Sequence, residues 1–147
     1  MKALKFLFVL IALTALSFQA MPQASSFETN TSTLKVWYWT DTIANTGTVT
    51  GVYPYNIPAG WSYSVQVVAD SLSGATAGNL YLKASNSVNG TEYETLQTLV
   101  LNGVKVTDLW EVTTQTPNVK LEVTATGSGT MSCKVRAWFV LKKIPVY

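Results

Sequence analysis

The segment Asn118-Val-Lys-Leu-Glu-Val-Thr-Ala125 decides the fold class, because apolar and polar residues alternate along its whole length. Val119, Leu121, Val123 and Ala125 fall on one side of an extended chain, and the polar residues fall on the other. This period of two is typical of a β-strand with one buried face and one face in water. The segment therefore predicts a strand that packs its apolar side against a second layer.

The same alternation recurs in three further segments, and shorter candidate strands cover residues 34–41, 48–53, 94–101 and 109–113. The expected inward residues are Tyr63, Val65, Val67 and Ala69, then Leu80, Leu82 and Ala84, then Cys133, Val135, Ala137, Phe139 and Leu141. Turn signals separate the segments, including Asn-Gly pairs at 89–90 and 102–103. Short amphipathic strands predict an all-β, antiparallel β-sandwich, with a jelly-roll or an immunoglobulin-like strand order both open.

Composition limits both the domain count and the chemistry. The chain has 147 residues, 48% of them hydrophobic, which suits one domain. With no His and a single Cys, a His-assisted nucleophile, a His or Cys metal cluster and an internal disulfide are excluded. The net charge of +2 comes from Lys2 and Lys5 near the start, so the remaining chain is neutral. A nucleic acid is not an expected partner, because such binding depends on clustered basic residues.

The N-terminus reads as a secretion signal. Lys2 and Lys5 precede an apolar run over residues 6–16, which is short for a membrane span. We expect a leader helix over residues 1–21 that is a signal peptide or a retained anchor, a flexible linker over 22–33 and the sandwich domain over 34–147. A membrane would be contacted only through a retained leader.

Several strand and turn segments together resemble a small β-sandwich domain of bacteriophage and other virion structural proteins, of the decoration, spike or fibre type. The segments that carry the resemblance are Trp61–Val68, Ser73–Thr91, Leu109–Val112 and Asn118–Thr130. The hairpin reads Ser-Asn-Ser-Val-Asn-Gly where that family has Ser-Asn-Asp-Gly, and a leader is unusual for it. The resemblance implies a capsid-associated or surface structural role.

Aromatic residues are the main candidates for an interface or ligand site. They are Trp37, Trp39, Tyr53, Tyr55, Trp61 and Trp138. In residues 34–41 both faces of the expected strand are apolar, with Trp37 and Trp39 on one and Tyr38 on the other. Such residues form sugar-stacking platforms or subunit contacts, although ordinary core and edge packing is the favoured interpretation. We expect Trp138 to lie opposite the inward residues of its strand and to be partly exposed.

Other residues give weaker hypotheses. Cys133 is expected to be a buried free thiol. A calcium site is conceivable only if loops gather Asp41, Asp70, Asp108 and Glu111, and Glu92 and Glu94 have a spacing that suits a glycosidase pair. The tripeptides at 30–32 and 89–91 match the N-glycosylation pattern. We predict no catalytic, cofactor-binding or metal-binding residue and no cofactor.

Two functions stay open from the sequence. The first is a non-enzymatic structural or attachment protein of a virion or cell surface that forms a homo-oligomer and contacts other surface proteins. The second is a secreted carbohydrate-binding module that binds glycans through exposed aromatic residues. Both predict a location on a virion or outside the cell. The first also predicts that Trp37 and Trp39 form part of a subunit contact.

Overall fold

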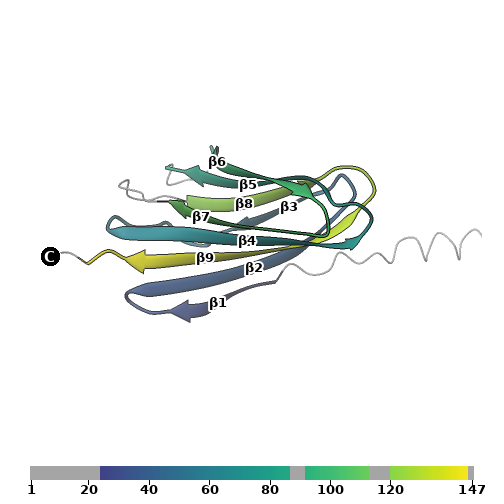
Figure 1. The fold of residues 1–147 in the computed structure, drawn as a ribbon. Coiled ribbons are helices and arrows are strands. Elements are labelled where there is room, and N and C mark those ends of the chain that lie inside the picture. The colour runs from purple at the N-terminus through teal and green to yellow at the C-terminus, as the bar shows by residue number, and fades with distance from the viewer. Residues whose placement is uncertain (1–23, 87–91, 113–119, 146–147) are drawn as a thin grey trace, which may run out of the picture.

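The computed structural model describes residues 24–86, 92–112 and 120–145, and every regular element in these ranges is a β-strand (Figure 1). The strands are β1 (Ala24–Asn30), β2 (Leu34–Ala44), β3 (Thr48–Val52), β4 (Trp61–Ser73), β5 (Ala77–Ser85), β6 (Glu94–Asn102), β7 (Lys105–Val112), β8 (Lys120–Gly127) and β9 (Ser132–Lys143). The shorter candidate strands of the sequence analysis correspond to β2, β3, β6 and β7.

Two antiparallel sheets form the sandwich. One has five strands in the order β1-β2-β9-β4-β7, and the other has four in the order β3-β8-β5-β6. From β2 to β9 the chain passes from one sheet to the other at every connection except the β5–β6 hairpin. This strand order is that of a jelly roll with β1 added at one edge. The predicted antiparallel sandwich is confirmed. Of the two strand orders that the sequence left open, the structure has that of the jelly roll and not the immunoglobulin-like one.

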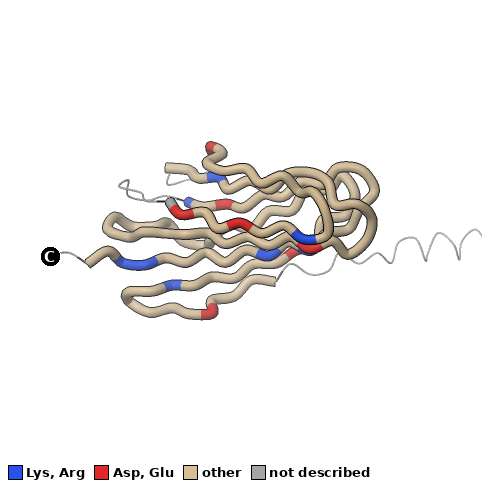
Figure 2. The backbone as a smooth tube through the Cα atoms, in the orientation of Figure 1, with Lys and Arg blue, Asp and Glu red and all other residues tan. Residues whose placement is uncertain are grey.

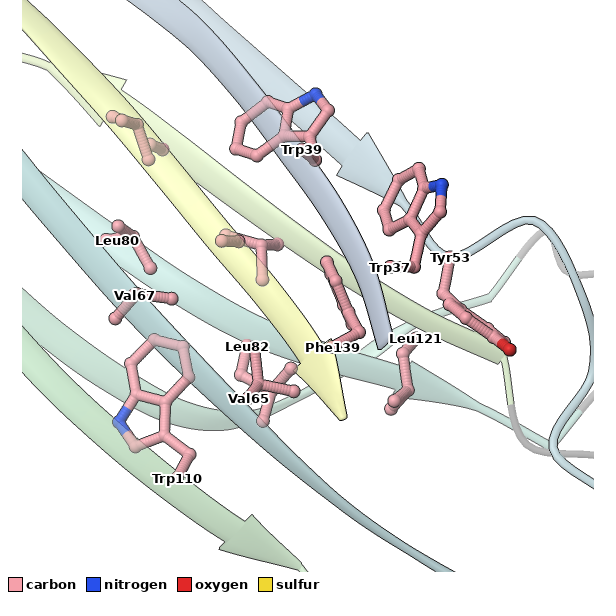
Figure 3. Packing of buried hydrophobic residues seen from close by; sticks show 14 of the residues in the cluster. Trp37, Trp39, Tyr53, Val65, Val67, Leu80, Leu82, Trp110, Leu121 and Phe139 are labelled. Carbon is pink, nitrogen blue, oxygen red and sulfur yellow. The ribbon is translucent and has the colours of Figure 1, made fainter. Parts of the chain in front are cut away.

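The core lies between the sheets and consists of the residues that the alternation places inward (Figure 3). On β9, Cys133, Val135, Ala137, Phe139 and Leu141 are all buried. The expected inward residues of β4, and Leu80 and Leu82 of β5, are buried as well. On β8, Leu121, Val123 and Ala125 are fully buried, whereas Val119 lies outside the described residues. The period-two predictions are therefore confirmed on all four strands.

The linker predicted over residues 22–33 is wrong from Ala24 onward, because β1 occupies Ala24–Asn30 and pairs with β2 along its length. Its single large apolar residue, Phe27, packs against the core, and a bulge between Phe27 and Thr29 interrupts the alternation. Backbone pairing with the edge of β2 thus holds a segment whose side chains are mostly polar. The predicted leader at 1–21 and the Asn-Gly pair at 89–90 lie outside the described residues.

Two buried tyrosines make the fold sensitive to alkaline pH. Burial raises the pKa of Tyr53 and of Tyr63 to about 12, from 10.0. Their folded pKa exceeds the unfolded one, so their contribution is fully present below pH 10.0 and is lost as the pH rises toward about 12.

We therefore expect the denaturant midpoint to fall steeply between those two pH values. Denaturant titrations at successive pH values, with phenolate absorbance followed in parallel, measure this. A Tyr53→Phe, Tyr63→Phe double variant should show a shallower fall. An equal slope in the variant would assign the alkaline loss to other groups.

Candidate functional site

The six aromatic candidates divide into buried and accessible residues. Trp37, Trp39, Tyr53 and Trp61 belong to the core, with exposed fractions between 0% and 9%. Tyr55 is 56% exposed, and Trp138 is half-buried on the outward side of β9. Only these last two could contact a partner or ligand.

The expected subunit contact through Trp37 and Trp39 is not possible in this fold, because both rings lie between the sheets. Trp37 packs against Tyr53 and Phe139, at ring-centroid distances of 6.0 and 5.2 Å. The four-stranded sheet already covers these rings (Figure 3). The apolar strip that Trp37 and Trp39 form is therefore buried by the other sheet of the same chain and needs no partner chain to cover it.

Tyr55 lies at one end of the sandwich in an aromatic group that is already in contact. Its ring stacks on Phe27 at a centroid distance of 5.8 Å and an interplanar angle of 25°. The Nζ atom of Lys35 lies 5.8 Å from the Tyr55 ring centroid and 5.6 Å from that of Trp61. These contacts hold the 53–61 segment against β1 and β2, which is a structural role.

The outer face of the five-stranded sheet offers a different aromatic pair. β2 and β9 are adjacent, and Tyr38 stands directly opposite Trp138 in their register. The two rings lie 5.1 Å apart with an interplanar angle of 44°, and both are half-buried. Trp138 was expected to be partly exposed, and this is confirmed. Tyr38 was not among the candidates from the sequence. Its contact with Trp138 depends on the pairing of β2 with β9, which local sequence does not reveal.

Polar groups lie on three sides of this pair on the same face, and Val36 and Val140 lie on the fourth. Gln66 of β4 is exposed and follows Trp138 in the same row, and Ser26 of β1 precedes Tyr38. In the next row Thr40 and Arg136 are opposite each other, and the Thr40 hydroxyl donates to the Val135 carbonyl at 2.9 Å. Two aromatic rings thus lie among hydroxyl, amide and guanidinium groups on a sheet surface.

The outer face of the four-stranded sheet uses its polar groups internally. Thr48 and Thr126 hydroxyls lie 3.2 Å apart across the β3–β8 pair. Lys83 donates to Glu122 at 3.3 Å, and Thr124 donates to the same carboxylate at 2.5 Å. These pairs stabilise the four-stranded sheet.

The other residues singled out from the sequence do not form a functional site in the described part of the chain. Cys133 is a buried free thiol, and burial raises its pKa, as expected of an inert core residue. Asp70 forms an ion pair with Arg136, and Asp108 accepts a hydrogen bond from the Trp110 indole at 2.7 Å. Both carboxylates are thus engaged by other side chains of the domain. In residues 24–86, 92–112 and 120–145 no three metal-ligating side chains gather.

The glycosidase pair and the glycosylation motifs fall on the surface. Glu92 and Glu94 are both exposed at the start of β6, without the apolar enclosure of a catalytic acid. Asn30 is exposed at the end of β1, and the motif at 89–91 lies outside the described residues. Within the part of the chain that the structure describes, no helix is long and apolar enough to cross a membrane.

Comparison with known proteins places this chain by fold alone. No family model matches it, and no curated protein matches it. The K1 cleaved adhesin domain of Lys-gingipain from Porphyromonas gingivalis W83 has a similar fold, with a TM-score of 0.50, 8% identity and coverage of 87% of this chain and 95% of that chain. At these identities the likeness concerns the sandwich architecture.

Two further solved structures are similar at lower TM-scores. One is TmCBM61 in complex with β-1,4-galactotriose, at a TM-score of 0.48 and 12% identity, covering 87% of this chain and 93% of that chain. The other is a Bacillus endospore appendage of a disulfide-linked pilus family, at 0.42 and 9%, covering 84% and 92%. A likeness of fold does not establish function, so the functional proposal depends on the residues of the outer face.

Proposed function

We propose that this domain is a carbohydrate-binding module that binds an oligosaccharide on the outer face of its five-stranded sheet. The observation that carries the proposal is the Tyr38–Trp138 pair, which is half-buried and lies between the polar side chains of Ser26 and Gln66. Together with the predicted secretion signal, the proposal places the domain outside the cell, where glycans are available.

The chemistry of a sugar suits this surface. A pyranose ring has an apolar C–H face that packs on an aromatic ring, and a rim of hydroxyl groups that need hydrogen-bonding partners. Tyr38 and Trp138 supply the first, and Gln66, Ser64 and Thr40 supply the second. The proposed function is the second of the two hypotheses from the sequence, with Tyr38 added and the core aromatics removed.

A structural subunit is the weaker alternative. It relied on an apolar strip formed by Trp37 and Trp39, and both rings are in the core. On the outer face of β9 charged residues flank Trp138 and Val140 on both sides, whereas the centre of a subunit interface is depleted of charge. The resemblance to virion proteins stays an interpretation of the sequence.

The test is binding to a panel of soluble polysaccharides, measured by affinity electrophoresis and by tryptophan fluorescence. Trp138→Ala and Tyr38→Ala should each weaken binding about tenfold, because each removes an aromatic contact. Tyr81→Ala is the matched control, since this half-buried tyrosine lies on the outer face of the other sheet.

Thermal unfolding and solution mass complete the test. All three variants should keep the wild-type fold, so a change in affinity reports on the surface alone. The proposal fails if no polysaccharide binds, or if Tyr81→Ala is as harmful as Trp138→Ala. It also fails if the wild type is an oligomer that Trp138→Ala dissociates, which would make the face a subunit interface.

A further inference from the structure

We propose that the glycan bound on this face is anionic, carrying carboxylate or sulfate groups. This inference rests on the proposed function and adds the substrate class. It comes from the charge on β9, the central strand of the five-stranded sheet, whose sequence contains four basic residues and no acid. Figure 2 shows basic segments toward both ends of this strand.

The basic side chains flank the aromatic pair along the strand. Lys134, Arg136 and Lys142 share the outward side of β9 with Trp138, because they are separated from it by even numbers of residues. Lys134 and Lys142 are exposed, and each lies four residues from Trp138, or about 13 Å at the usual rise of a strand. An extended oligosaccharide centred on Trp138 would thus reach a cation in each direction.

The acids on this face do not balance these cations. Across β2, β9, β4 and β7 the outward charged residues are Lys105, Lys134, Arg136 and Lys142 against Asp70 and Glu111, and the edge strand β1 adds the exposed Glu28 at its bulge. Asp70 accepts from Arg136 and lies 4.0 Å from the Lys105 ammonium, so its charge is already neutralised. Glu111 lies on β7, at the sheet edge.

The excess is local, because the chain beyond its first 21 residues is neutral. Basic and acidic residues number eight each there. On the opposite sheet Lys83 pairs with Glu122 at 3.3 Å. Lys120 is the other basic residue on the outward side of that sheet, whereas Lys134 and Lys142 lie on either side of Trp138 on β9, where they would attract carboxylate or sulfate groups of a sugar chain.

The experiment compares sugars that differ only in charge. An oligogalacturonide and its methyl ester are titrated against the wild-type domain at low and high salt, and a sulfated oligosaccharide and its desulfated form serve as a second pair. We expect about fivefold tighter binding of the charged member in at least one pair, and loss of this preference at high salt. The pair that shows the preference identifies the anion.

Charge reversal locates the effect. Lys134→Glu and Lys142→Glu, singly and together, should abolish the preference and leave the affinity for the neutral member unchanged. Lys120→Glu is the matched control, because this residue lies on β8 in the other sheet and its reversal changes the net charge by the same amount as each single variant. Thermal unfolding checks that the exposed positions tolerate the changes.

The outcomes separate this inference from the proposed function. Equal affinity for charged and neutral sugars, both weakened by Trp138→Ala, would overturn the charge preference and keep the carbohydrate site. Failure of every sugar to bind would overturn the proposed function itself. If a single-stranded oligonucleotide binds as tightly as the charged sugar, the face is a general polyanion surface and the inference is wrong.

Discussion

Replacing Leu121 with Asp is expected to unfold the domain. Leu121 is fully buried on the inward side of β8, and its carbonyl accepts from the Tyr53 amide at 2.9 Å, so it lies where β8 meets the chain after β3. A carboxylate at this position would be buried among apolar side chains, without solvating water and without a paired cation among the described residues. Burial of an unpaired ionised group costs several kcal/mol, against a total stability of about 5–15 kcal/mol for a small domain.

Glu122→Lys is the control for this substitution, because it makes a charge change one residue further along the same strand. Glu122 points outward and contacts both Lys83 and the Thr124 hydroxyl, so reversal loses one partly exposed ion pair and one hydrogen bond and costs about 2 kcal/mol. Circular dichroism and denaturant titration compare the two variants. Similar behaviour of both would mean that the inward and outward sides of β8 are reversed.

The strand faces could be predicted from the sequence because each depends on local alternation. On β4, β8 and β9 a one-residue shift would move every inward apolar side chain to the outer face, so burial of one face fixes the register. The same logic correctly separated Trp37 and Trp39 from Tyr38 on β2. It could not say which side of β2 would be covered, because that depends on the order of strands in the sheet.

The candidate site was predictable only in part, for the same reason. The partly exposed position of Trp138 follows from β9 alone. Its pairing with Tyr38 requires β2 to lie beside β9, although the two strands are almost a hundred residues apart at that point. β1 was missed because one apolar residue, Phe27, and a bulge give no period to recognise. Long-range pairing therefore decides both the edge of the domain and the make-up of the proposed binding face.

A glycine within β3 gives the second large effect. Gly51 interrupts a strand that is otherwise rich in Thr and Val, and glycine ordinarily weakens a strand. Here the Trp39 ring occupies the space above it. A Cβ atom at position 51 would lie 2.6 Å from both Cγ and Cε2 of Trp39, closer than real contacts allow. The backbone of β3 can thus approach the five-stranded sheet only because residue 51 has no side chain.

We expect Gly51→Ala to destabilise the domain by about 3 kcal/mol, because Trp39 is fully buried and has no room to move away. Trp39→Leu alone should also cost about 3 kcal/mol, through the cavity that it leaves. In the double variant the new methyl group enters that cavity. The cost of Gly51→Ala should therefore nearly vanish when Trp39 is Leu, giving a coupling of about 3 kcal/mol between the two positions.

Denaturant titrations of the wild type, both single variants and the double variant measure this coupling. Val52→Ala is the control, since Val52 is exposed on the same strand and should cost less than about 1 kcal/mol in every background. Additive costs for Gly51→Ala and Trp39→Leu would show that the two residues do not compete for one space. The destabilisation would then come from the strand itself, and the glycine would have no packing role beneath the indole.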